Sequence, residues 1–184
     1  MNFPIRPVLF AICVLFLAVP ATALERSTVE RWITALDAVN TWAVEHDPRI
    51  RAEIRSLTEP RDVNFDQVWS EGFLSHPAVR DRLGRHGFDD PEAWNAVSGR
   101  VLAAVLALEM QQALVKAREY TAEDRERIAN HPDIDPEDKQ QMFEQMDAQL
   151  ARLRALAEGA PESDIAAVRH VLGDFERIVA ARGE

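Results

Sequence analysis

Apolar residues recur three and four positions apart along most of this chain, and that spacing predicts amphipathic helices rather than strands. The first stripe predicts a helix over residues 27–46, and its apolar members are Val29, Trp32, Ile33, Leu36, Val39 and Ala43. Ser27 and Glu30 have the spacing of a capping box, so we expect the Ser27 hydroxyl to accept a hydrogen bond from the Glu30 amide. A shorter helix is predicted to restart at Asp47-Pro48.

A third stripe is aromatic. Phe65, Trp69 and Phe73 lie at helical spacing between Pro60 and Pro77, and they predict one face of a short, separately hinged helix. Aromatic stripes of this kind usually cover a hydrophobic core. A short helix bounded by prolines can also line an apolar groove for a peptide or a lipid. Both interpretations stay open, and these three aromatic residues are our candidate ligand-binding residues.

The strongest helical pattern lies in the middle of the chain. Residues 77–87 predict a short helix, with Gly87 in the left-handed conformation that often ends a helix. The next helix is predicted to begin at Asp90-Pro91. Between Val101 and Leu108 its residues are apolar most of the way around, as in a buried helix. We therefore place this helix at the centre of the fold.

Two amphipathic helices are predicted after a charged stretch at residues 121–130. The first carries Phe143, Met146, Leu150, Leu153 and Ala157, and the second carries Ile165, Val168, Leu172, Phe175 and Val179. The connection EGAPE is short enough to make them an antiparallel hairpin. We expect Leu150 and Leu172 to be buried on the facing stripes of that hairpin.

These elements predict an all-α protein of about seven helices, some of them short. Runs of β-branched residues are few, and the chain has seven glycines, which argues against a sheet protein. No internal repeat or linker divides the pattern. We expect a single-domain helical bundle over residues 24–184, with a buried central helix and a C-terminal antiparallel helical hairpin.

The first 23 residues have the parts of a secretory signal peptide. Arg6 supplies positive charge, an apolar run of about a dozen residues follows, and Ala21 and Ala23 fit a signal peptidase site. The run is shorter than the roughly 18–20 residues that a membrane span requires. We therefore expect cleavage after Ala23, a periplasmic location and no stable transmembrane anchor. Cleavage would also remove Cys13, the chain's one cysteine, so disulfides would contribute nothing to the stability of the mature chain.

Acidic residues outnumber basic ones. The chain has 31 Asp and Glu against 21 Lys and Arg, a net charge of −10, and loss of Arg6 would leave 20 against 31, or −11. Nucleic acids bind to basic patches, so we expect no nucleic-acid partner. A protein, peptide or lipid of the cell envelope is the partner class that remains.

The densest group of possible metal ligands is NHPDIDPEDKQ, residues 130–140. A calcium loop beginning at Asp133 would place Pro136 inside its tight turn and Asp138 where such loops require glycine. The same residues fit the start of a helix, in which Asp135 caps and Pro136 takes the first position. The Asp-Pro pair recurs at two other predicted helix starts. We therefore predict a helix start here rather than a calcium site.

Catalytic and metal sites have no local pattern. The histidines, which are His46, His76, His86, His131 and His170, never lie three or four positions apart, as two metal ligands on one helix face would. No serine lies in G-x-S-x-G, and no glycine-rich phosphate loop is present. We therefore assign no catalytic residue, no metal ligand and no cofactor. Dispersed carboxylates can still form a hydrolytic pair, so a hydrolase remains the alternative.

Residues 76–104 contain two linked motifs. A short helix ends in a Gly-Phe turn, and the next helix opens with P-E-x-W and runs into R-V-x-x-A. This segment resembles a group of uncharacterised secreted, all-helical proteins of proteobacteria. The resemblance extends to PEDKQQ at 136–141 and to the final helix. It implies an exported helical protein and no catalytic residue.

These observations favour a non-enzymatic binding or interaction protein of the bacterial cell envelope, either a chaperone-like module or an accessory subunit. The alternative is an envelope hydrolase that uses dispersed Asp and Glu carboxylates. A wide apolar groove containing Trp69 would indicate binding, whereas a deep polar cleft with convergent carboxylates and histidine would indicate hydrolysis.

Overall fold

The regular structure consists of helices. Residues 23–58 and 65–180 are described by a computed structural model, and within them no strand occurs. The helices are α1 (Arg26–His46), α2 (Pro48–Arg55), η1 (Ser56–Thr58, a 3-10 turn), α3 (Glu71–Ser75), α4 (Pro77–Arg85), α5 (Pro91–Ala129), α6 (Pro136–Ala157), α7 (Glu162–Val168) and α8 (Leu172–Ala180). The all-α prediction is confirmed. The predicted signal peptide lies outside the described residues, except for Ala23.

Membrane-spanning helices are absent from the described part of the chain, because none of its helices combines the necessary length and apolarity. The buried stripes are short and are interrupted by charged positions.

Three helices begin as the Asp-Pro pairs predict. Asp47 Oδ1 accepts hydrogen bonds from the amides of Arg49 and Ile50, at 2.9 and 3.2 Å. Asp90 and Asp135 each accept one from the amide two residues further on, at 3.0 and 2.9 Å. The proline that follows each aspartate has no N–H to satisfy. The helix start predicted at Asp135 is therefore confirmed.

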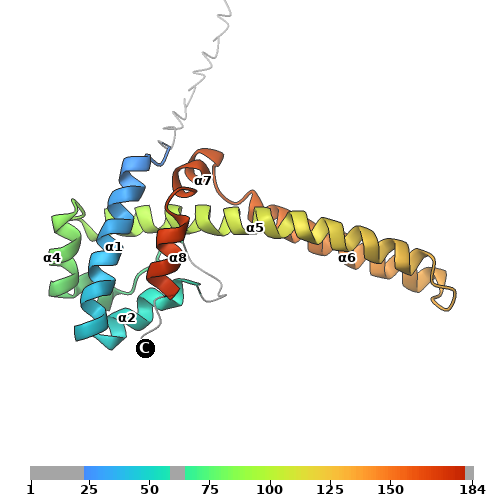
Figure 1. Cartoon of the computed structure of the whole chain (residues 1–184), viewed down its shortest axis with the longest axis horizontal. Coiled ribbons are helices and arrows are strands. Elements are labelled where there is room, and N and C mark those ends of the chain that lie inside the picture. The colour runs from blue at the N-terminus through green and yellow to red at the C-terminus, as the bar shows by residue number, and fades with distance from the viewer. Residues whose placement is uncertain (1–22, 59–64, 181–184) are drawn as a thin grey trace, which may run out of the picture.

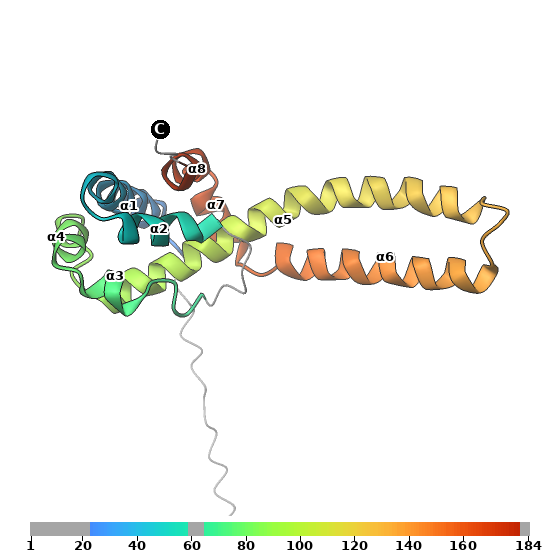
Figure 2. The same cartoon turned by 90° about the horizontal axis from the view of Figure 1, so that it is seen from below.

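The helices form a base from which a long hairpin projects (Figure 1). Helix α5 has 39 residues, which correspond to about 58 Å at 1.5 Å per residue. Its first part packs in the base against α1 and α7, and the rest leaves the base alongside α6 (Figure 2). Gln111 Nε2 donates to the Ala157 carbonyl oxygen at 3.5 Å, where α6 reaches the base. We call residues 111–157 the arm and the other described residues the base.

Tryptophans form the centre of the base. Trp32, Trp69 and Trp94 are at most 1% exposed, and the rings of Trp32 and Trp94 stack with centroids 5.7 Å apart. Ser98 lies buried on α5 between them. Its hydroxyl accepts from the indole N–H groups of Trp32 and Trp69, both at 2.8 Å, and donates to the Trp94 carbonyl at 2.8 Å. One hydroxyl therefore connects α1, the segment before α3 and α5.

The predicted central position of α5 is confirmed over its first part. The residues buried there include Trp94, Ser98, Val101, Leu102, Ala104, Val105, Ala107 and Leu108. The base is closed by contacts between the first and last helices. Asn40 Nδ2 donates to the Ile178 carbonyl at 3.4 Å, and Arg177 pairs with Asp37 at 3.4 Å.

The predicted C-terminal hairpin is wrong in its pairing. The antiparallel hairpin consists of α6 and the distal part of α5, and α7 and α8 pack in the base instead (Figure 2). Leu150 and Leu172 are each only half-buried and do not face one another across a hairpin. The last stripe is buried as predicted except for half-buried Leu172, but the helix that carries it is interrupted after Val168. Residues 121–129, predicted as a separate charged stretch, continue α5.

The predicted capping box at the start of α1 is also wrong. Glu25 occupies the cap position and makes no side-chain capping bond, so the helix begins one residue early. The Ser27 hydroxyl donates instead to the Glu25 carboxylate at 3.3 Å. The apolar stripe of α1 is buried as predicted.

Candidate binding groove

The segment before α3 is not the helix that its aromatic spacing predicts. Residues 65–70 form turns and bends, and α3 begins only at Glu71. Asn95 on α5 supplies the hydrogen bonds that a helix would otherwise make. Its Oδ1 accepts from the amides of Val68 and Trp69 at 3.0 and 3.3 Å, and its Nδ2 donates to the Asp66 carbonyl at 2.6 Å. The Asn95 side chain therefore holds residues 66–69 against α5.

Gly99 allows the same segment to approach α5 closely. A Cβ atom at this position would clash with the Phe65 carbonyl oxygen, far inside van der Waals contact. Glycine lowers helix stability relative to alanine. At residue 99 only glycine leaves room for the Phe65 carbonyl, which explains its presence in the helix. Asn95 and Gly99, one helical turn apart, thus determine where the segment lies.

A groove of about 1110 Å³ opens beside this segment. One wall comes from residues 65–75, the floor from the first part of α5, and the far wall from the turn between α6 and α7. Apolar groups that line it include Phe65, Leu74, Pro91, Ala96, Ala103 and Ala160. Its charged lining residues are Asp66, Glu71, Glu92, Asp164, Arg80 and Arg100. Acidic groups therefore outnumber basic groups, and the uncharged part of the lining is mainly apolar.

The three aromatic residues predicted as a ligand-binding face are divided between the groove and the core. Trp69 is 1% exposed, stacks on Phe73 at 4.2 Å between ring centroids, and lines the groove. Phe73 is fully buried and is not among the lining residues. Phe65 is half-buried and lines the groove. The tryptophan therefore anchors the wall, and Phe65 presents the accessible aromatic surface.

An ion pair joins α5 to α7 where both helices line the groove. Asp164, 1% exposed, receives two hydrogen bonds on Oδ2 from Arg100, from Nε at 3.0 Å and Nη2 at 2.8 Å. Arg100 Nη2 also lies 2.9 Å from Oδ1. A bidentate arrangement of this kind is the strong form of an arginine–carboxylate pair. It attaches α7 to α5 across 64 residues of sequence.

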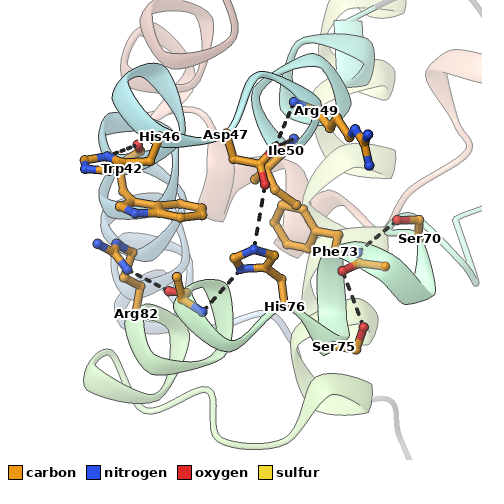
Figure 3. Close-up of polar contacts among 12 residues, drawn as sticks. Trp42, His46, Asp47, Arg49, Ile50, Ser70, Phe73, Ser75, His76 and Arg82 are labelled. Carbon is orange, nitrogen blue, oxygen red and sulfur yellow. Dashed lines mark hydrogen bonds and ion pairs between the residues drawn. The ribbon is translucent and has the colours of Figure 1, made fainter.

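One histidine–carboxylate contact lies at a junction of helix ends (Figure 3). His76 Nε2 is 3.7 Å from Asp47 Oδ2, and His76 Nδ1 accepts from the Ala78 amide at 3.3 Å. Asp47 caps α2 and His76 caps α4, so both side chains already have structural roles. Arg82 lies over the ring of Trp42 at 4.8 Å and covers the same junction.

Sequence reasoning missed the groove residues on α5 and α7, both apolar and polar. The glycine inside a strongly apolar helix could have indicated a close backbone approach at Gly99. Asn95 and Arg100 carried no comparable indication, because their partners lie 26 to 64 residues away. Asp164 looked like an ordinary acid in the first turn of a helix.

Metal chemistry has no assembled site in the described residues, which contain no group of three His, Cys, Asp or Glu side chains placed to hold an ion. Histidine is also absent from the described lining of the groove. No protein-family model, no curated protein and no solved structure matches this chain. The resemblance of residues 76–104 to secreted helical proteins therefore stays a prediction.

Proposed function

We propose that this chain is an exported, non-enzymatic binding protein of the cell envelope, whose groove receives an apolar segment of a partner polypeptide flanked by basic residues. The observation that carries the proposal is the groove itself, whose uncharged lining is mainly apolar and whose charged lining has more acidic than basic groups. Ligand sites are typically concave and mostly apolar, with a few polar groups that fix orientation.

The charges of the lining select among possible occupants. Four carboxylates face two guanidinium groups there, and one of those, Arg100, is already paired with Asp164. Such a lining repels anionic lipid headgroups and attracts a cationic flank, because complementary potentials steer association. A polypeptide with basic flanks therefore suits this groove better than a lipid.

The arm adds little to this choice. Five large hydrophobic residues are exposed among the described residues, and four of them lie on the arm, namely Val115, Tyr120, Met142 and Leu156. They are spread singly over α5 and α6, as apolar residues on protein surfaces often are, so the proposal rests on the groove. A hydrolase with dispersed carboxylates receives less support, because Asp164 is committed to an ion pair and the groove's described lining holds no histidine to share a proton.

Two peptides with the same apolar core test the groove, one with basic flanks and one with acidic flanks. We expect residues 24–184 to bind the basic-flanked peptide more tightly, measured by fluorescence anisotropy, and to lose that preference as salt screens the charges. Ala96→Arg should abolish binding, because it fills the groove and reverses local charge. Ala93→Arg is the matched control, since Ala93 is exposed on the same helix but does not line the groove.

Equal effects of the two arginine substitutions would contradict the groove as the binding site. Binding to anionic vesicles in preference to both peptides would contradict the choice of a polypeptide occupant.

Export is tested separately by the mass of the protein recovered from the periplasm. We expect a chain that begins at Leu24, because Ala21 and Ala23 fit the peptidase site. The resemblance of residues 76–104 to secreted proteins supports the same location. A full-length species extracted only with membranes would contradict export and cleavage.

A further inference from the structure

A buried carboxylate accepts a hydrogen bond from the backbone just before α1. The amide nitrogen of Leu24 donates to Asp164 Oδ1 at 3.0 Å, across 140 residues of sequence. The contact is enclosed, because Leu24 is 6% exposed and Asp164 is 1% exposed. Ala23, one residue earlier, is exposed. The chain therefore enters the core at Leu24, and the amide of Leu24 is aimed at a negative charge.

The carboxylate has two other hydrogen-bonding partners besides the Leu24 amide. Its oxygens accept from Arg100, whose side chain is 37% exposed and faces the groove, and from the Ser163 hydroxyl at 3.3 Å. Leu24 contributes only a neutral N–H. Arg100 already balances the charge of the carboxylate, and a positive charge on the Leu24 nitrogen would turn its neutral hydrogen bond to Oδ1 into a charge-assisted one, which is stronger.

We propose that Asp164 is the docking site of the mature chain's own N-terminal ammonium group, formed when the Ala23–Leu24 peptide bond is hydrolysed. This inference rests on the proposed cleavage after Ala23. An envelope signal peptidase supplies the reaction, in which water breaks the C–N bond. The carbonyl carbon of Ala23 takes the hydroxyl and leaves as a carboxylate, and the nitrogen of Leu24 becomes an ammonium.

Docking requires Leu24, and no neighbouring residue, to be the new N-terminal residue. Successive Cα atoms are about 3.8 Å apart, so a chain that begins one residue earlier carries its charge away from Asp164 and into solvent beside exposed Ala23. A chain that begins one residue later loses the buried Leu24 side chain, which is part of the hydrophobic core. The Leu24 start alone provides both the side chain and the charge.

Processing would also strengthen one side of the binding groove. Asp164 and Arg100 both line the groove. Arg100 already holds α7 to α5, and the docked ammonium would also hold α7 to the beginning of α1. Asp164 accepts from the Leu24 nitrogen and Arg100 pairs with Asp164, and the next charged groups along the chain are Glu25 and Arg26.

Amine reactivity tests the proposal directly. Two chains are prepared by cleaving a fusion that leaves no extra residue, one beginning at Leu24 and one at Ala23. The only other amines in them are Lys116 and Lys139, both on the arm, which serve as internal references for acylation followed by mass spectrometry. We expect the Leu24 amine to react about tenfold more slowly in the folded chain, because it is enclosed beside Asp164, where the reagent cannot reach it and the unreactive charged form is paired. In urea the two termini should react alike.

Thermal stability provides the second readout. The Leu24 chain should melt at a higher temperature than the Ala23 chain, and acetylation of Leu24 should remove the difference. The added stability should be present while the terminal amine is charged, below its ordinary pKa of about 7.7–8.0. It should disappear at alkaline pH, where a neutral amine offers Asp164 no charge.

Asp164→Asn should abolish the difference between the two chains in both readouts. If that variant does not fold, the acetylated Leu24 chain makes the same comparison without a mutation. Equal amine reactivity and equal melting temperatures for the Leu24 and Ala23 chains would overturn the docking proposal. Because both chains are made with defined starts, that result would leave export unaffected, and a periplasmic mass that begins elsewhere would contradict the cleavage alone.

Discussion

At the residue scale, more than one buried group depends on Ser98 as its hydrogen-bond partner. Two buried indole N–H groups donate to its hydroxyl, and a buried donor without a partner costs about 1–3 kcal/mol. We expect Ser98→Ala to lower the free energy of unfolding by more than one such penalty, measured by urea denaturation. The substitution removes little volume, so the loss would come from the hydrogen bonds rather than from a cavity.

A double-mutant cycle isolates that cause. Trp69→Phe removes one of the two donors, and in the Ser98→Ala background it should cost less than it does in the natural chain, because that donor is already unpaired. Additive effects of the two substitutions would show that Ser98 acts only through packing.

Residue-scale features were predictable where both partners are close in sequence. The caps at Asp47, Asp90 and Asp135 each involve an amide two or three residues away, so the local sequence contains the whole interaction. Asn95 and Asp164 could not be found in this way. Their roles depend on which distant segment arrives beside them, and one sequence without its fold does not contain that information.

At the scale of elements, the arm is stabilised by half-buried contacts. The inner side chains of α6 are Phe143, Met146, Leu150 and Leu153, all half-buried against α5. Arg125 covers the Phe143 ring at 4.8 Å and pairs with Asp147. A two-helix arm has no third layer to complete its burial, so its stability should be lower than that of the base.

Hydrogen exchange tests this difference. Leu153→Ala should increase the exchange of α6 amides while leaving α1 nearly unchanged, with a cost of about 1–2 kcal/mol, below the 2–5 kcal/mol of a fully buried leucine. Leu156→Ala is the matched control, because Leu156 lies on the same helix and is 47% exposed. Faster exchange of α1 in the Leu153 variant would show that the arm and the base unfold as one unit.

The stripe of α6 was predicted correctly, but its partner was not. Distal α5 is rich in Ala, Glu and Arg, which are strong helix formers, and so it continues as a helix beyond its apolar part. Leu114 and Ile128 remain buried in the arm, enough for α6 to pack there. The helix predicted for the aromatic segment is absent for the opposite reason. Asn95 makes hydrogen bonds with the backbone of residues 66–69, so helical spacing there did not produce a helix.

At the scale of the whole molecule, the class of the fold followed from periodicity, whereas its division into base and arm did not. Periodicity reports which face of a helix is buried, but not which other helix buries it. The arm is inserted between the parts of the base, because α1 and α8 pack together while α6 lies far from both (Figure 1). The groove lies where the chain returns from the arm, at the turn between α6 and α7.

This insertion has a consequence for the order of folding. The contacts that close the base join residues 138 and 140 positions apart, and the entropy of closing so long a loop delays them. The arm consists of neighbours in sequence and is free to form first. A chain that emerges N-terminus first during its synthesis would therefore have no closed base until α8 had emerged, although its arm would already be free to form.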